Sequence, residues 1–249
     1  MYYNQFIIFF SFLIFLFSCK SDDSEEIIEK DIPLYLTEWA PIGAKWYYSD
    51  SSPGHSPEDG NGYLVIESVR DTLLNNIDAR VLEIHYFFLG ELQYKKIEVM
   101  YGDMEKVYHW DKHEEEFYKL YDFSANSDDT LEIRPESFIN YFGEEINYFV
   151  SVIDSTFYRD FNGLSLKVLI AKPVIYEDNL ESVWMYAEGG ADATIIQGIG
   201  SAFWMFGGQQ FSLQSEKSHI GLRCFEYNGS VYKYNNYPLD CDYMSLETK

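Results

Sequence analysis

The stretch that decides the fold is Gly62–Phe123, GYLVIESVRDTLLNNIDARVLEIHYFFLGELQYKKIEVMYGDMEKVYHWDKHEEEFYKLYDF. It contains short runs rich in Tyr, Phe, Val and Ile that are separated by a few turn-forming or charged residues. Such runs are typical of β-strands, and linkers this short join antiparallel neighbours, because a parallel crossover needs a dozen or more residues. Five strands are expected here, at Gly62–Arg70, Ala79–Phe88, Leu92–Tyr101, Lys106–Trp110 and Glu116–Phe123.

The sequence on both sides of this stretch continues the strand pattern. In Leu164–Ala171, the side chains of Leu166, Val168 and Ile170 alternate with polar ones, as in a sheet with one buried side. Strand signals begin at Ala44, and further strands are expected at Asn147–Phe161, Leu164–Ala171, Ser182–Glu188 and Gln210–Glu216, followed by a closing hairpin.

Helix signals are scarce in the same sequence. Pro135–Phe142 has a proline at an early helical position and Gly143 as a stop, so it predicts one helical turn at most. Ser49–Gly62 has two prolines and three glycines, which indicates an exposed loop. The expected fold is mainly β, a single antiparallel meander curled into a half-barrel or a sandwich.

The N-terminus has the pattern of an export signal. Phe6–Phe17 is apolar except for Ser11, and it is shorter than the roughly 20 residues that span a bilayer. Leu16–Cys19 follows, and it resembles the lipobox of bacterial lipoproteins, in which a small residue precedes the acylated cysteine. We therefore expect lipid attachment at Cys19. The alternatives are ordinary cleavage with secretion and an uncleaved membrane-inserted segment.

The next residues indicate a tether and a location. Lys20–Glu26 resembles the acidic tag that directs some outer-membrane lipoproteins to the cell surface, although a flexible charged tether would have the same composition. We expect a signal peptide over 1–18, a lipidated acidic tether over 19–33 and one β-rich domain over 34–249. The expected location is the outer membrane, with the domain exposed at the cell surface.

The charge of the chain limits its partners. It carries 41 acidic and 18 basic residues, a formal net charge of -23, and none of these charges lies in the first eighteen residues. Binding to a phosphate backbone needs Lys and Arg to displace counterions, and anionic headgroups would repel this chain. The composition argues against nucleic acid, and it leaves the lipid on Cys19 as the expected membrane contact.

The three cysteines favour one disulfide. With Cys19 assigned to the lipid, Cys224 and Cys241 remain, and a metal site would need further ligands. Gly221–Tyr227 and Ser230–Asn235 flank Asn228–Gly229, a pair suited to a type I′ turn, so a hairpin is expected there. Pro238 would then turn the chain back and bring Cys241 near Cys224.

The short motifs that invite a chemical reading favour simpler interpretations. His109 and His113 stand four apart, but Lys106–Trp110 and Glu116–Phe123 are expected to pair as strands, so we expect a polar hairpin tip with solvated histidines rather than a metal site. Glu58–Gly62 lacks most of a calcium loop and predicts a turn. Gly198–Ser201 lacks the spacing of a phosphate loop or a nucleophile elbow, so bulges or close packing beneath Phe203–Trp204 are expected.

Aromatic residues make up 18% of the chain, including 22 tyrosines. Trp46–Tyr48 and Phe203–Trp204 could form a stacking platform for sugars, but aromatic side chains also fill β cores. A glycosidase-like acid and base would be recognised by their separation and their unequal environments, which the sequence does not give. No cofactor or metal is expected, and no catalytic residue can be named.

Several short phrases resemble a group of uncharacterised bacterial secreted proteins and lipoproteins. They are Ile42–Tyr48, Leu120–Phe123, Gly198–Ser201 and, most specifically, Leu222–Gly229 followed by Val231–Tyr232 and Cys241–Tyr243. The resemblance implies a β-rich exported module and supports the disulfide, but it implies no activity. We expect a binding or structural role with an extracellular glycan or protein as ligand; the alternative is a hydrolase of an extracellular polymer that uses a carboxylate pair.

Overall fold

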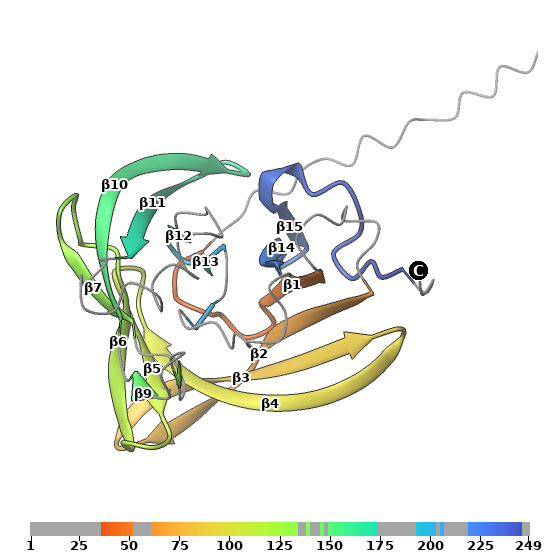
Figure 1. Ribbon diagram of the computed structural model, residues 1–249, viewed down its shortest axis with the longest axis horizontal. Helices are drawn as coiled ribbons and strands as arrows, with labels where there is room; N and C mark the ends of the chain where they lie inside the picture. The colour runs from red at the N-terminus through yellow and green to blue at the C-terminus, as the bar shows by residue number, and fades with distance from the viewer. Residues whose placement is uncertain are drawn as a thin grey trace, which may run out of the picture. The chain divides into compact units, whose positions relative to one another are not determined.

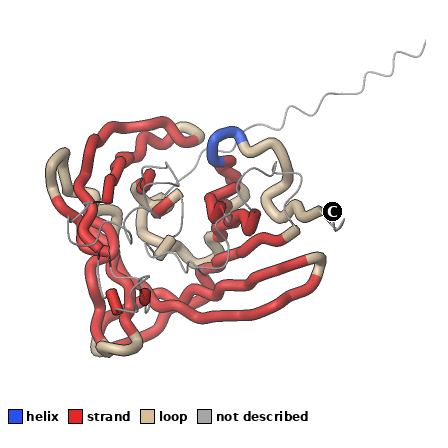
Figure 2. Tube along the Cα trace, in the orientation of Figure 1, coloured by secondary structure: helices blue, strands red, loops and turns tan. Residues whose placement is uncertain are grey.

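Antiparallel strands form two large sheets (Figures 1 and 2). The structure is a computed structural model, and it describes residues 36–51, 61–133, 138–139, 145–146, 149–173, 193–202, 205–206 and 219–245. All of these residues belong to one unit, Asp31–Lys249. The described residues include no helix long and apolar enough to cross a membrane. The fold is mainly β, as the sequence predicts.

The larger sheet has eight strands in the order β15-β14-β1-β2-β3-β4-β5-β6, and we call it sheet 1. Its core is the expected meander, and the C-terminal hairpin joins it by pairing β14 with β1. Its strands are β1 (Lys45–Ser51), β2 (Gly62–Leu74), β3 (Ile77–Phe88), β4 (Glu91–Gly102), β5 (Lys106–Asp111), β6 (Glu116–Asp122), β14 (His219–Tyr227) and β15 (Ser230–Lys233).

The smaller sheet, sheet 2, has the order β13-β12-β11-β10-β7. Its strands are β7 (Thr130–Ile133), β10 (Phe149–Phe161), β11 (Leu164–Pro173), β12 (Ala193–Ile196) and β13 (Gly200–Ser201). A separate pair joins β8 (Phe138–Ile139) to β9 (Glu145–Ile146). The predicted helical turn over 135–142 is therefore wrong at Phe138–Ile139, whose backbone pairs with another strand instead of closing a turn. The helix drawn blue in Figure 2 is a single 3-10 turn, η4 (Tyr234–Asn236).

Tight turns fix the register of the hairpins. Asn228 and Gly229 both have positive φ, 53° and 78°, and they connect β14 to β15 as the sequence predicts. Asn162 and Gly163 make the same kind of turn between β10 and β11. A two-residue turn with positive φ at both positions matches the right-handed twist of the flanking strands.

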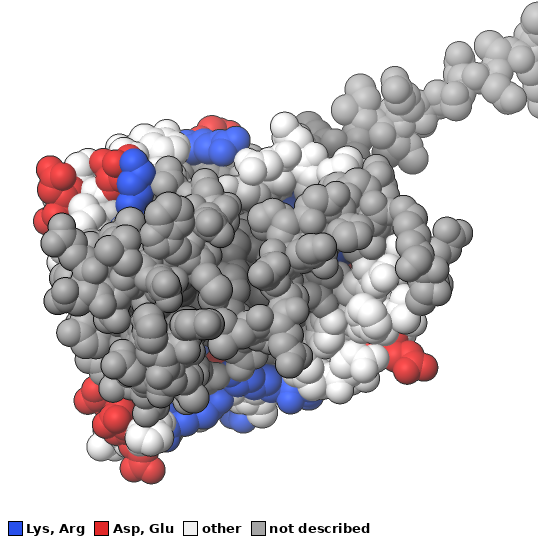
Figure 3. Space-filling model, viewed as in Figure 1, with Lys and Arg blue, Asp and Glu red and all other residues white. Residues whose placement is uncertain are grey.

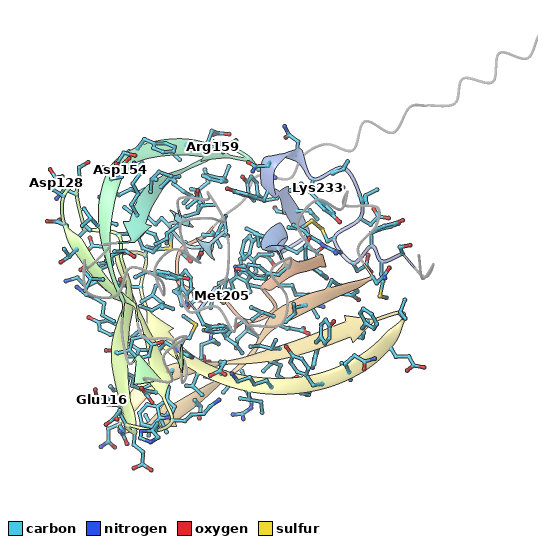
Figure 4. The ribbon with its side chains drawn as sticks, in the orientation of Figure 1. Glu116, Asp128, Asp154, Arg159, Met205 and Lys233 are labelled. Atoms are coloured by element: carbon cyan, nitrogen blue, oxygen red, sulfur yellow. A yellow bond between two sulfur atoms is a disulfide. The ribbon has the colours of Figure 1, made fainter. Side chains whose placement is uncertain are left out.

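The core lies between the two sheets, where buried polar atoms of sheet 1 hold the end of sheet 2. The Trp46 indole donates to the carbonyl oxygen of Ile199 at 2.7 Å, and the Tyr48 hydroxyl donates to that of Ser201 at 2.9 Å. The Tyr121 hydroxyl accepts from Ser201 N at 3.1 Å and donates to the Met205 carbonyl, near the label in the middle of Figure 4. These bonds satisfy buried polar groups that would otherwise destabilise the core.

Several sequence predictions need adjustment or lie outside the described residues. Ser49–Ser51 belongs to β1, so the predicted loop begins later, because all three residues pair with β14 and the first two also pair with β2. Residues 52–60 and the strands expected at Ser182–Glu188 and Gln210–Glu216 lie outside the described part of the chain. So do Cys19 and the whole of 1–35, and the domain boundaries stay predictions.

Candidate functional site

Three polar side chains form a buried chain on the inner face of sheet 1, the face that carries Trp46. His109 Nε2 lies 3.1 Å from Glu98 Oε2, and His109 Nδ1 lies 2.8 Å from the Tyr118 hydroxyl. The exposed fractions of Glu98, His109 and Tyr118 are 1%, 2% and 8%. Both contacts of a neutral imidazole are satisfied when Nε2–H donates to the carboxylate and Nδ1 accepts from the phenol.

Two lysines complete the surroundings of the Glu98 carboxylate. Lys96 Nζ lies 2.9 Å and Lys112 Nζ 3.2 Å from its Oε1 atom, and Lys112 also donates to the Ile97 carbonyl at 2.8 Å. Burial raises the pKa of Glu98, but the hydrogen bonds and charges of His109 and Lys96 outweigh it and lower the pKa to about 2. Glu98 is therefore held as a carboxylate, and Lys112 ties the β5–β6 loop to β4.

This arrangement corrects the prediction of two solvated histidines. His109 lies inside β5, on the same face of the strand as the buried Val107, so its side chain points into the core. There the centroid of the Phe206 ring lies 5.0 Å from that of His109. His113 does lie at the hairpin tip, with 92% of its side chain exposed. Across the described residues, no group of three or more His, Cys, Asp or Glu side chains is placed to hold a metal ion.

Four aromatic side chains gather on the outer face of the same strands, and we call them the outer cluster: Tyr101, Tyr108, Trp110 and Phe117. The rings of Tyr101 and Tyr108 are stacked, with centroids 4.5 Å apart and planes 3° apart. Phe117 contacts Tyr101 edge-on at 4.7 Å and Trp110 at 5.0 Å. All four side chains are half-buried, so each ring keeps part of its surface in water.

The inner chain and the outer cluster use alternate residues of one hairpin. His109 pairs with Tyr118 across β5 and β6, and the next pair, Trp110 with Phe117, projects from the opposite face. Glu116, labelled in Figure 4, begins β6 at the end of this hairpin. The register that closes the buried hydrogen bonds therefore also sets the outer rings side by side.

A second aromatic row on the outer face, Tyr47, Tyr63 and Phe87, has a different environment. Tyr63 stacks on Phe87 at 5.1 Å, and the Arg223 guanidinium lies 5.7 Å from the Tyr63 ring and 5.5 Å from that of Tyr237. Arg223 also donates to the carbonyl oxygens of Gly62 and Tyr243. Arg223 therefore links this half-buried row to the C-terminal segment.

A disulfide between Cys224 and Cys241, the pair expected from the sequence, holds this segment in place, with Cα atoms 5.6 Å apart. Arg223, next to Cys224 in β14, donates to Ser49 Oγ at 2.8 Å. The bridge thus joins the C-terminal segment to the strand that pairs with β1.

The structure assigns packing roles to the other candidates from the sequence. Trp46 and Tyr48 are fully buried and bonded, so they fill the core and do not form the sugar platform that was the alternative for this run. Tyr47, between them, faces outward and is half-buried. A Cβ atom at Gly198 would lie 2.9 Å from Leu36, and one at Gly200 3.1 Å from Trp39, which agrees with close packing. Phe203–Trp204 and Glu58–Gly60 lie outside the described residues.

The buried acids of the described chain are Glu98 and Asp122. Burial raises the pKa of Asp122, but hydrogen bonds from Lys119 and Ser124 outweigh it, so the pKa is lowered. Both acids are therefore held ionised. A glycosidase acid needs the opposite, a carboxyl with a raised pKa.

No family model and no curated protein matches the chain. A similar solved structure is a Bacteroides fragilis protein described as exported and as having a YmcC-like fold. It is 10% identical, the TM-score is 0.39, and the alignment covers 78% of this chain and 100% of that one. At so low a score the likeness carries no argument about function, which has to come from the chain's own residues.

Proposed function

We propose that the chain is an exported bacterial lipoprotein that binds an extracellular ligand with the outer cluster. Acylation at Cys19 anchors it to the outer membrane, the acidic segment Lys20–Glu26 directs it to the cell surface, and the β domain presents Tyr101, Tyr108, Trp110 and Phe117 to the surroundings. The lipobox pattern supports the anchor, and the half-exposed rings of the outer cluster support binding.

The observation that carries the binding proposal is the contrast between the aromatic groups of sheet 1. Trp46 and Tyr48 are buried and bonded, and Tyr63 lies beneath Arg223. The outer cluster is half-buried, as Tyr63 is, but among the described residues no cation lies over any of its rings, so the group keeps surface for a ligand. Aromatic side chains that are grouped on a rigid sheet are suited to ligand contact, because little conformational entropy is lost on binding.

Binding is favoured over the alternative of a carboxylate-pair hydrolase by the state of the buried acids. Glu98 is neutralised by Lys96 and Lys112, and Asp122 by Lys119 at 2.7 Å. Neither has the raised pKa of a general acid. A hydrolase would have to use acids other than these two.

The anchoring part of the proposal is tested in the native cell. Cys19→Ala should abolish labelling by a palmitate analogue and release the domain into soluble fractions, whereas Cys224→Ala should keep both label and membrane association. Retention of the Cys19→Ala protein in the membrane would contradict the anchor. Replacement of Asp22, Asp23, Glu25 and Glu26 with Ala should lower protease accessibility on intact cells without loss of the lipid; unchanged accessibility would contradict surface targeting.

The binding part is tested with immobilised full-length mature protein and the extracellular polymers of the native culture. Trp110→Ala should reduce the retained material about tenfold or more, as expected when a central ring contact is lost. Tyr158→Ala is the matched control, because Tyr158 is an aromatic residue of sheet 2 that is 69% exposed and lies on β10, away from the cluster. Equal retention by the unaltered protein, Trp110→Ala and Tyr158→Ala would contradict a role for the outer cluster.

A further inference from the structure

We infer that the ligand of the outer cluster is a neutral saccharide, held by the rings together with a pair of adjacent phenol hydroxyls; this inference rests on the proposed function. The stacked rings of Tyr101 and Tyr108 come from directly paired residues of β4 and β5, so their hydroxyl groups project side by side. No residue of the described chain makes a hydrogen bond to either hydroxyl. Two neighbouring groups that both donate and accept suit a polyhydroxylated ligand.

The state of these hydroxyls fits the same ligand class. Burial, and then the neighbouring Tyr108, raise the pKa of Tyr101, so its phenol stays protonated across the physiological range. Tyr101 therefore offers a neutral hydrogen-bond donor and acceptor instead of charge. A ligand that carried no hydroxyl or amide groups would leave these donors unpaired on binding, which costs affinity.

Three lysines near the outer cluster are paired with acids of the protein. Lys119, opposite Tyr108, pairs with Asp122 at 2.7 Å, and Lys112 contacts Glu98 at 3.2 Å. Lys95 on β4 pairs with Glu83 at 2.7 Å. Figure 3 shows Lys and Arg atoms gathered along the edge of the drawn face where β3 and β4 run, with acidic atoms toward its ends.

The net charge argues against a polyanionic ligand. At -23, the chain repels polyanions over distances comparable to the Debye length, about 8 Å at physiological salt. A neutral polymer meets neither this repulsion nor a demand for counter-charges at the cluster. The competing occupant is a basic polypeptide, which would bind the ring faces by cation–π contact and the acidic tip, Glu114–Glu116, by charge.

The experiment uses affinity electrophoresis of the full-length mature protein in gels that contain dextran, mannan, galactan, xylan or hydroxyethyl cellulose, with polylysine tested by fluorescence anisotropy. The double variant Tyr101→Phe, Tyr108→Phe keeps both rings and removes both hydroxyls. We expect at least one neutral polysaccharide to retard the protein equally between about 0.05 and 0.5 M NaCl. The double variant should weaken this binding about tenfold or more, the effect of two lost hydrogen bonds.

Tyr158→Ala should bind as the unaltered protein does, and Trp110→Phe should keep most of the affinity because it keeps a ring. The contrary result is binding to polylysine and to no polysaccharide, with binding that is lost at high salt and unchanged in the double variant. That result would overturn the saccharide proposal in favour of a basic polypeptide. Retardation by none of the polysaccharides would also overturn it. The proposed function fails separately, if Trp110→Ala leaves retention of native extracellular material unchanged.

Discussion

Replacing Glu98 with Gln tests the buried chain beneath the outer cluster, and the structure sets the size of the effect. The pKa of Glu98 is lowered from 4.5 to about 2, which corresponds to about 3 kcal/mol of stabilisation of the ionised form in the folded state. The glutamine amide is neutral, as the protonated carboxyl of Glu98 would be. Glu98→Gln should therefore lower the free energy of unfolding by about 3 kcal/mol at neutral pH, and Tm by roughly 6–12 °C.

The pH dependence has a definite sign. A carboxyl whose folded pKa lies below its unfolded pKa contributes stability that is complete above the unfolded value and is lost as pH falls through the folded value. Urea denaturation of both proteins should thus show a gap that is constant above about pH 5 and closes toward pH 2. Glu83→Gln is the control, since this partly exposed acid pairs with Lys95 on the outer face and should cost less than about 1 kcal/mol. Equal stability of Glu98→Gln and the unaltered protein at pH 7, or a gap that persists unchanged at pH 2, would refute the reasoning.

Three further variants test other parts of the fold by urea denaturation. Tyr118→Phe leaves Nδ1 of His109 buried without its donor and should cost about 1–3 kcal/mol; no loss would mean that the bond contributes nothing. Trp46→Phe removes the bond to Ile199 and should cost a similar amount, whereas an unchanged midpoint would contradict its role in joining the sheets. Replacing Cys224 and Cys241 with Ala opens a link across 17 residues and should cost about 3 kcal/mol, with limited proteolysis starting after β15; resistance of that segment would contradict the staple.

Much of the fold follows from local patterns in the sequence. The meander from β2 to β6 is readable because apolar and aromatic residues alternate within runs that are joined by short linkers. The Asn228–Gly229 turn is readable because few residues tolerate positive φ at both positions. The second sheet and the pairing of β14 with β1 are not readable in this way, because they depend on contacts between distant segments.

The candidate site was only partly accessible to the same reasoning. The alternation places His109 on the same face of β5 as Val107, which indicates burial. Glu98 shares its face of β4 with Lys96 as well as Met100, so the pattern does not indicate that Glu98 is buried. Only the register of three strands brings Glu98, His109 and Tyr118 together. The same holds for the outer cluster, since Trp46–Tyr48 form the denser aromatic run in sequence and yet two of the three point into the core.

The central claim is that the outer cluster is the surface through which this protein meets its ligand. The most direct test places a photoreactive phenylalanine analogue at Phe117 and, in a separate protein, at Tyr158, and irradiates intact cells that carry each one on the native anchor. The account predicts a covalent adduct with extracellular material at position 117 and none at position 158. Adducts of equal yield at both positions, or an adduct at position 158 alone, would contradict it.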